Sequence, residues 1–247
     1  VTPDSFSDGG KYNHLDAALR HTEEMIRDGA DIIDVGGEST RPGHVVITEE
    51  EEIARVTPVI EAIKRNFDIP ISIDTYKGKV TLAALQAGAD LVNDIWGFKH
   101  DSKVAEYTAK YKAACCLMHN RNEAVYNDFQ KDVIADLQEC IAIAKKANVA
   151  DDKIILDPGV GFGKTYEMNL EIINHLEKLH ELNYPVLLGT SRKSVIGLTL
   201  DLPADERVEG TLATTVIGVM KGCSFVRVHD VKENARIIKM TEAILSK

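Results

Sequence analysis

Two stretches, DGADIIDVGG (28–37) and AGADLVNDIW (87–96), share one plan: a helix end, a glycine, an apolar run and then polar residues. Glycine directly after a helix is the usual left-handed helix end. The β-branched run that follows is typical of a buried strand. These junctions therefore predict a fold in which helices lead directly into strands of one sheet.

The same alternation extends along the whole chain. Near-continuous apolar strands separated by amphipathic helices are typical of a parallel sheet whose two faces are both covered. The predicted strands are 31–37, 70–75, 91–96, 113–119, 153–159, 185–190 and 224–230. The predicted helices lie around 14–28, 48–66, 77–87, 101–111, 128–147, 166–181, 205–221 and 231–245.

Seven strands against eight helices suggest that one strand is missing at the front, just upstream of Val1. We therefore predict an α/β fold, a (β/α)8 TIM barrel in a single domain over 1–247, whose first strand is absent from the chain or trimmed from it. A doubly wound sheet is the competing fold. It is disfavoured because no Gly-x-Gly-x-x-Gly turn follows the first strand.

The composition limits the class of protein. The chain has 247 residues, 44% of them hydrophobic, and a net charge of -10, which argues against a dedicated nucleic-acid or anionic-membrane surface. No apolar run approaches a membrane span and no signal peptide opens the chain, so we expect a soluble, cytoplasmic protein. Cys115, Cys116, Cys140 and Cys223 form no C-x-x-C pair and are expected to be buried, reduced thiols.

Polar residues gather at the carboxyl ends of the predicted strands, where a barrel carries its active site. For Asp34, Glu38, Asp94 and His119, a structural hydrogen bond to a loop is an equally good interpretation. The full set is Asp34, Glu38, Asp74, Asn93, Asp94, His119, Asp157, Ser191, Lys193, Arg227 and His229.

Two groups within this set suggest specific chemistry. Arg227 and His229 lie two apart on one strand, so they face the same side and can hold an anion. Asp74, Asn93 and Asp157 are expected to converge, and a carboxylate can accept two parallel N–H donors from a pterin or guanine edge. A protein-held divalent metal is the alternative interpretation of these acids.

The segment DPGVGFGKT (157–165) nearly matches a P-loop. The P-loop pattern needs a glycine at 158, where Pro158 stands, so a nucleotide-phosphate cradle is not expected. The glycines are expected to allow a tight turn close to a ligand. Lys164 is expected to pair with a loop or with solvent.

Seven motifs in one order resemble the dihydropteroate synthase family: VTPDSFSDGG, DVGGESTRPG, ISIDTYK, LVNDI, DPGVGFGK, GTSRKS and VRVHD. The motifs cover the whole chain, and together they are specific although each alone is weak. The resemblance implies a (β/α)8 transferase of folate biosynthesis and a sulfonamide target. It implies that the enzyme joins 6-hydroxymethyl-7,8-dihydropterin pyrophosphate to p-aminobenzoate, assisted by Mg2+, and releases pyrophosphate with 7,8-dihydropteroate.

The resemblance also implies site residues. Lys193, Arg227, His229 and Asp74 would be catalytic, and the family is usually a homodimer. The Asn that contributes to the family's metal site would lie just before Val1, so no metal ligand is assigned within the chain. The pterin set is Asp74, Asn93, Ile95, Met118, Asp157, Phe162, Gly189 and Lys193; the p-aminobenzoate set is Phe6, Thr40, Arg41, Pro42, Phe162 and Ser194; the pyrophosphate set is Arg41, Arg227 and His229.

The expected mechanism is dissociative substitution at the exocyclic CH2 without a covalent enzyme intermediate, because Ser191 and Ser194 show no partner base in the sequence. Two other functions stay open. A pterin-dependent methyltransferase would share Asp74, Asn93 and Asp157 but has no need for the STRPG and SRKS segments. A non-catalytic pterin-binding relative is the other, because the Asn before Val1 is missing.

Overall fold

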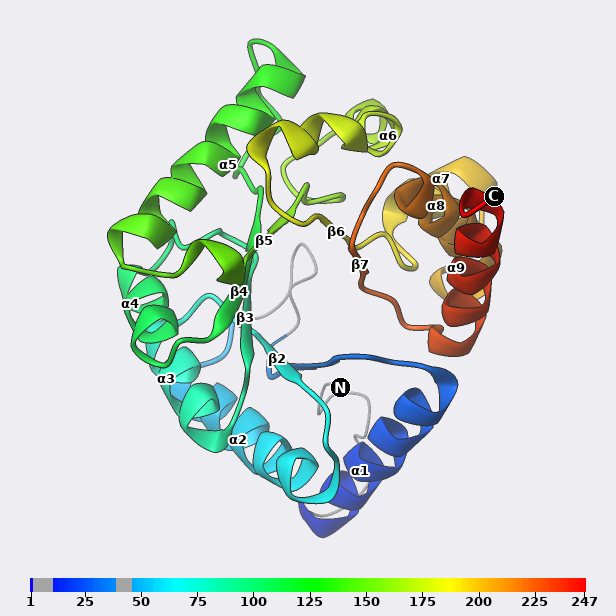
Figure 1. The fold of residues 1–247 in the computed structure, drawn as a ribbon. Helices are drawn as coiled ribbons and strands as arrows, with labels where there is room; N and C mark the ends of the chain where they lie inside the picture. The colour runs from blue at the N-terminus through cyan, green and yellow to red at the C-terminus, as the bar shows by residue number, and fades with distance from the viewer. Residues whose placement is uncertain (2–10, 39–45) are drawn as a thin grey trace. The chain divides into compact units, whose positions relative to one another are not determined.

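The computed structural model describes residues 1, 11–38 and 46–247, which form two compact units. Unit 1 comprises Val1–Leu117 and Cys140–Ile154, and unit 2 comprises Met118–Glu139 and Ile155–Lys247. Strands alternate with helices along the chain (Figure 1), and every strand pair with an assigned register is parallel. The α/β class is therefore confirmed, whereas the single domain remains a prediction.

Unit 1 contains a parallel sheet whose strands follow one another in chain order. These are β1 (Ile33–Gly36), β2 (Ile71–Asp74), β3 (Leu91–Asp94) and most of β4 (Ala114–Met118). Its helices are α1 (Lys11–Asp28), α2 (Glu49–Asn66), α3 (Gly78–Ala87) and α4 (Ser102–Lys110), of which α2 packs on α3 and α3 on α4 along one side of the strands (Figure 1).

The core of unit 1 lies between this sheet and these helices. Ile71 and Ile73 in β2 and Val56, Ile60 and Ile63 in α2 are fully buried. Burial of such side chains contributes about 1.5–3 kcal/mol each. The apolar face of each helix thus fixes the sheet, and with it the carboxyl ends of the strands.

The two junctions that predicted this fold have the expected geometry. Gly29 and Gly88 adopt φ of 105° and 111°, the left-handed conformation that ends a helix. The N–H of Gly88 donates to the carbonyl oxygen of Leu85 at 3.2 Å, which satisfies one of the last carbonyls of α3. The chain then turns directly into β3.

Unit 2 carries the last strands. Leu156 of β5 (Ile154–Asp157) forms a parallel bridge with Val186, and β6 (Leu187–Leu188) pairs with β7 (Phe225–Val226). The helices of this part are α6 (Tyr166–Asn174), α7 (Ser194–Leu200), α8 (Val208–Met220) and α9 (Val231–Leu245); β4, α5 (Phe129–Lys146) and β5 each have residues in both units.

All seven predicted strands are present but shorter than predicted; two helix predictions need correction and one helix was not predicted. The segment 166–181 is not one helix, because α6 breaks at His175 (φ -121°, ψ 31°) and continues as a 3-10 helix over Leu176–Leu182. The segment 205–221 begins with a 3-10 turn, Ala204–Glu206, before α8. The seven-residue α7 was not predicted, since two turns are too short to show a periodic pattern.

Burial agrees with the sequence for most cysteines. Cys115, Cys116 and Cys140 are buried thiols, while Cys223 is only half-buried. Within the residues that the structure describes, no helix has the length and apolar character to cross a membrane.

Candidate active site

Asp74 and Asn93 end neighbouring strands of unit 1. They are register partners in the parallel pair β2–β3 and therefore face the same side of the sheet. Both side chains are buried, as is Ile95 just after β3. A carboxylate beside an amide offers acceptors and one set of N–H donors, which suits the polar edge of a heterocycle.

The side chain of Asp94 stabilises the turn that directly follows it. Its Oδ1 accepts the N–H of Trp96 at 2.8 Å, and its Oδ2 accepts that of Phe98 at 2.9 Å. Complete burial raises the pKa of this carboxyl to about 7, opposed in part by these two donors. For Asp94 the structural interpretation is therefore confirmed.

Glu38 has a structural role as well. The Nζ atom of Lys77 lies 2.6 Å from Glu38 Oε2 and 2.8 Å from Glu52 Oε2, and the hydroxyl of Tyr76 donates to Glu38 Oε1 at 2.7 Å. Burial acts to lower the pKa of Lys77, but the two carboxylates outweigh it and raise the pKa. Asp34 is half-buried in β1.

In unit 2, the DPGVGFGKT segment follows β5 and turns through three left-handed glycines. The φ angles are 68° at Gly159, 86° at Gly161 and 55° at Gly163. A Cβ atom on Gly159 would collide with the carbonyl oxygen of His119, and one on Gly163 would lie 2.5 Å from that of Arg121. Glycine is thus required by the turn and by its close approach to the chain after β4, as the sequence predicted for the turn.

Asp157 lies at the start of this loop and is buried. Its Oδ1 accepts the N–H of Gly159 at 2.7 Å. A Cβ atom on Gly189 would lie 3.7 Å from Asp157 Oδ2, 3.8 Å from Lys193 Nζ and 3.9 Å from Arg227 Cβ. Four predicted residues, Gly189 and these three, thus gather at one place.

Burial and nearby cations act in opposite directions on the pKa of Asp157, and burial has the larger effect. Burial raises the pKa of its carboxyl, and the charges of Lys193, Lys164 and Arg227 together with the Gly159 N–H oppose that rise. The Nζ atom of Lys193 donates to the carbonyl oxygen of Val160 at 2.6 Å and lies 4.9 Å from the ring centroid of Phe162. Lys193 therefore interacts both with the ring of Phe162 and with the carboxylate of Asp157.

Arg227 and His229 follow β7 with exposed side chains. The imidazole Nδ1 of His229 lies 2.9 Å from Ser191 Oγ, and the backbone N–H of His229 donates to the same oxygen at 3.1 Å. The expectation that Ser191 has no partner base was wrong. The two residues are 38 apart in sequence, and only the pairing of β6 with β7 brings them together.

A second set of contacts joins the loop after β6 to the loop after β7, and the sequence analysis did not predict it. Arg192, with φ of 57°, places its Nε 3.1 Å from Asp230 Oδ2, and its carbonyl oxygen accepts from Arg207 at 2.9 Å. These contacts flank Lys193 and His229 on the chain. They fix the backbone on which both predicted residues stand.

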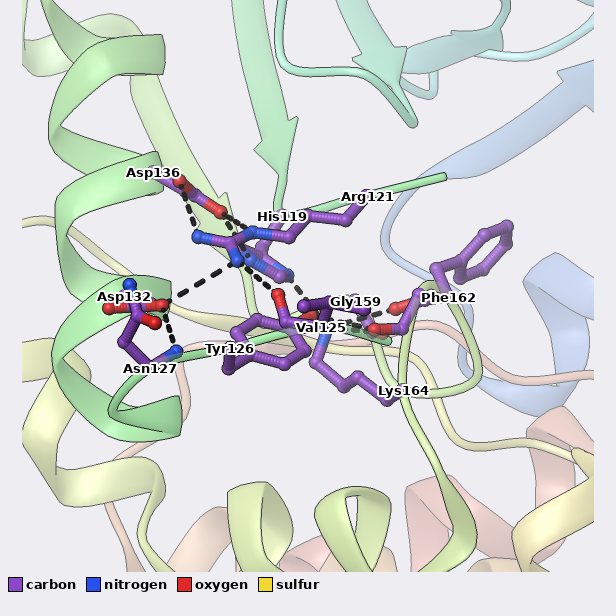
Figure 2. Close-up of polar contacts among 11 residues, drawn as sticks. His119, Arg121, Val125, Tyr126, Asn127, Asp132, Asp136, Gly159, Phe162 and Lys164 are labelled. Carbon is purple, nitrogen blue, oxygen red and sulfur yellow. Dashed lines mark hydrogen bonds and ion pairs between the residues drawn. The ribbon is translucent and has the colours of Figure 1, made fainter. Parts of the chain in front are cut away.

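A buried polar network lies behind the glycine loop (Figure 2). His119 is fully buried, with Nε2 at 3.0 Å from Asp136 Oδ2 and Nδ1 at 2.7 Å from Lys164 Nζ. Lys164 also donates to the carbonyl oxygens of Gly159 and Phe162, at 3.0 and 3.1 Å. Its pairing with the loop agrees with the sequence.

Burial and neighbouring groups shift the pKa values of Lys164 and Asp136 in this network. Burial lowers the pKa of Lys164 to about 7, against the charge of Asp157, which raises it. Burial alone would raise the pKa of Asp136, but hydrogen bonds from His119 and Arg121 reverse that effect and lower it. The sequence placed His119 at a strand end; Asp136 carried no signal, because it lies within an ordinary amphipathic helix.

The remaining predicted residues lie as follows. Met118 is buried at the end of β4, and Ser194 is exposed at the first position of α7. Phe6, Thr40, Arg41 and Pro42 lie outside the described residues.

A metal cage is not found in the described part of the chain. No group of three or more His, Cys, Asp or Glu side chains in those residues could hold a metal ion. The alternative interpretation of Asp74 and Asp157 as ligands of a protein-held metal therefore gains no support from these residues.

Comparisons with known proteins identify the family. The model of the pterin binding enzyme family matches residues 1–229. A dihydropteroate synthase of Clostridium beijerinckii is 64% identical over 245 residues, 99% of this chain and 91% of that protein.

Solved structures are also close. A dihydropteroate synthase from Clostridium difficile, crystallised in the presence of pteroic acid, has a TM-score of 0.97 and 51% identity over 100% of this chain and 94% of that chain. One from Yersinia pestis, in complex with a sulfonamide drug, has a TM-score of 0.93 and 42% identity over 100% and 92%. These structures have the (β/α)8 barrel fold, so the predicted fold class is confirmed. By the family model, these identities and the acid and cations gathered around Gly189, the chain belongs to the dihydropteroate synthases of the pterin-binding enzyme family.

Proposed function

We propose that the chain condenses 6-hydroxymethyl-7,8-dihydropterin pyrophosphate with p-aminobenzoate to give 7,8-dihydropteroate and pyrophosphate. The observation that carries this proposal is the position of Asp157, Lys193 and Arg227 around Gly189. A buried acid can accept the N–H donors of a pterin edge, while two cations beside it suit a carbonyl oxygen and an anionic leaving group. Membership of the family gives this arrangement its substrate.

Pterin recognition is assigned residue by residue. In unit 2, Asp157 accepts from the pterin edge, and Lys193 donates to the ring carbonyl beside Phe162. Asp74 and Asn93, an acid and an amide on one face of the sheet, are assigned to the pterin by the resemblance. Ile95, Met118 and Gly189 complete the pterin set by the resemblance stated above.

The leaving group is assigned to Arg227 and His229, with Arg41. Pyrophosphate takes the electron pair of the breaking C–O bond, so fixed positive charge at that oxygen lowers the barrier. Ser191 holds the imidazole of His229 through Nδ1 and through the backbone N–H. One hydroxyl thus orients the ring, and we assign Ser191 this supporting role instead of that of a nucleophile.

The carbon–nitrogen bond forms after the leaving group begins to depart. The exocyclic CH2 becomes cation-like, and the negative charges of Asp74 and Asp157 favour the electron-poor ring. The arylamine nitrogen of p-aminobenzoate attacks this carbon and then loses one proton. We assign the p-aminobenzoate site to Phe162 and Ser194 with Phe6, Thr40, Arg41 and Pro42, and sulfonamides to the same site.

Magnesium is part of the proposal through the substrate. Mg2+ typically keeps several waters and binds through one or two carboxylates together with substrate phosphates. The described residues form no cage for it. An ion carried by the pyrophosphate would neutralise charge on the leaving group, and no step assigned to Asp74, Asp157 or Lys193 depends on it.

A cytoplasmic homodimer completes the proposal. The thiols of Cys115, Cys116 and Cys140 fit a reducing compartment. The packed helices α8 and α9 expose large apolar side chains, which suits an interface with a second copy. These side chains are Ile217, Met220, Met240, Ile244 and Leu245.

The decisive experiment mixes the protein with dihydropterin pyrophosphate, Mg2+ and labelled p-aminobenzoate and follows labelled dihydropteroate. Product formation that requires both substrates is the expected result. Pterin binding without product would favour the non-catalytic relative. Transfer of a methyl group from methyl-folate to a corrinoid protein would favour the methyltransferase, and either outcome would overturn the proposal.

A further inference from the structure

Lys164 lies at the centre of the polar network behind the glycine loop. An ammonium has three N–H donors, and the Nζ atom of Lys164 has three acceptors: the carbonyl oxygens of Gly159 and Phe162 and the Nδ1 atom of His119. If Nδ1 accepts, the proton of the neutral imidazole is on Nε2, which faces the carboxylate of Asp136 at 3.0 Å. A charged Lys164 beside a neutral His119 with its proton on Nε2 therefore satisfies each of these contacts.

Asp136 closes the far end of this network. Its Oδ2 also accepts from Arg121 Nε at 2.6 Å, and its Oδ1 accepts from the same guanidinium at 3.2 Å. Arg121 stacks on the ring of Tyr126, with Cζ 4.3 Å from the centroid. Figure 2 shows these side chains, which come from the segment after β4 and from α5.

The loop itself needs such support. Its three left-handed glycines cost more conformational entropy to order than other residues. Lys164 donates to the carbonyl oxygens at both ends of the Gly159–Phe162 turn. The hydroxyl of Tyr126 donates to the carbonyl oxygen of Gly163 at 2.7 Å. The network thus supplies the donors that hold the loop in one conformation.

The same loop carries pterin residues. Asp157 accepts from the N–H of Gly159 through Oδ1, and its own carbonyl oxygen accepts the N–H of His119 at 2.9 Å. Phe162 is one of the two loop residues whose carbonyl Lys164 binds. A shift of the turn would therefore move both the acid and the aromatic ring.

We propose that Asp136, His119 and Lys164 form a positioning network that holds the glycine loop, and with it Asp157 and Phe162, in the geometry that receives the pterin. The identity of the ligand in this proposal rests on the proposed function, whereas the effect of the network on the loop does not. None of the three needs to touch the substrate. They act through the backbone of residues 157–163.

The main test replaces Lys164 by Met, which keeps the length of the side chain and removes its three donors. Folding should survive, because Asp136 keeps Arg121 and a buried charge is removed. Amide exchange at Gly161 and Phe162 should become at least about tenfold faster, because the turn loses two hydrogen bonds. The dissociation constant for 6-hydroxymethylpterin should rise about 10- to 100-fold, since displaced groups bind poorly.

Two further variants separate positioning from general stability. Thr215→Val removes a buried hydrogen bond to Asn234 in the same unit, far from the loop in sequence. It should lower the melting temperature without changing pterin affinity or loop exchange. Tyr126→Phe removes only the hydroxyl bonded to Gly163 and should give a smaller rise in both readouts than Lys164→Met.

Loop exchange in Lys164→Met that equals the wild type would overturn the network, as would pterin affinity that falls equally in Thr215→Val. Wild-type protein that binds no pterin would overturn the proposed function instead. The two failures are distinguishable because amide exchange is measured without ligand.

Discussion

Asp94 and Asp157 are both buried carboxylates at strand ends, yet their neighbours give them different tasks. Both carboxylate oxygens of Asp94 accept backbone N–H groups of the turn that follows it. Asp157 uses Oδ1 for Gly159, while its Oδ2 faces Gly189 near Lys193 and Arg227. Only Asp157 is therefore arranged to accept from a ligand.

Asp157 and Arg227 should affect different parts of the substrate. We expect Asp157→Asn to weaken binding of 6-hydroxymethylpterin about tenfold or more, because an amide cannot accept two parallel N–H donors and a charged hydrogen bond contributes about 1.5–3 kcal/mol. Arg227→Ala should leave this ligand unaffected and weaken only its pyrophosphate ester. Calorimetry of both variants with both ligands checks this. Unchanged pterin affinity in Asp157→Asn, or an equal loss for both ligands in Arg227→Ala, would contradict the assignment.

Gly159 and Gly161 form a matched pair for backbone strain. Both have positive φ, but a Cβ at Gly159 collides with the backbone of His119, whereas one at Gly161 lies 3.4 Å from Lys193 Cδ. Gly161→Ala should cost about 1–2 kcal/mol of unfolding free energy, from strain alone. Gly159→Ala should cost about 1–3 kcal/mol more, from overpacking. Urea denaturation measures both, and similar losses would argue against the close approach.

At the scale of elements, one side chain serves two helices of unit 1. Asp101 caps α4 through Oδ1, which accepts the N–H of Lys103 at 2.9 Å. Its Oδ2 accepts the N–H of Gly78, the first residue of α3, at 2.8 Å. Lys77 makes no cap with its own side chain, so α3 depends on an acid 23 residues away.

Asp101→Ala should therefore cost about twice as much as an ordinary cap. Loss of one N-cap typically costs about 1 kcal/mol, so we expect about 2 kcal/mol for Asp101. Thr48→Ala, which removes only the cap of α2 on Glu51, is the matched control. Equal losses in denaturant unfolding would mean that the bond to Gly78 contributes nothing.

At the scale of the whole molecule, acid should destabilise the fold partly through Asp136. Its folded-state pKa is lowered from 3.8, so its contribution is complete above that value and disappears as the pH falls below it. Melting temperatures of Asp136→Asn should fall less steeply than those of wild type between about pH 5 and pH 2. Asp152→Asn, on an exposed acid, should follow wild type; parallel curves for all three would reject the role.

Association should depend on α8 and α9. If a second copy covers this face, Ile244→Glu should shift sedimentation from dimer towards monomer, because a charge would be buried at the interface. Leu170→Glu, on the exposed part of α6, is the control and should leave the mass unchanged. A monomeric wild-type protein would remove the dimer from the proposal.

The sequence alone determined the α/β class, the order of its elements and the strand ends that carry polar residues. It also determined that 157–165 contains a glycine turn, because turn chemistry depends on residues next to one another. Local patterns did not predict α7 or the break at His175.

Only the tertiary structure decided which polar residues meet. Three hydrogen-bonded pairs are far apart in the sequence. Ser191 and His229 are separated by 38 residues, Gly78 and Asp101 by 23, and Lys164 and His119 by 45. The physical reason is that periodicity and propensity act within one element, whereas a buried hydrogen bond forms only where strand pairing and helix packing bring two elements together.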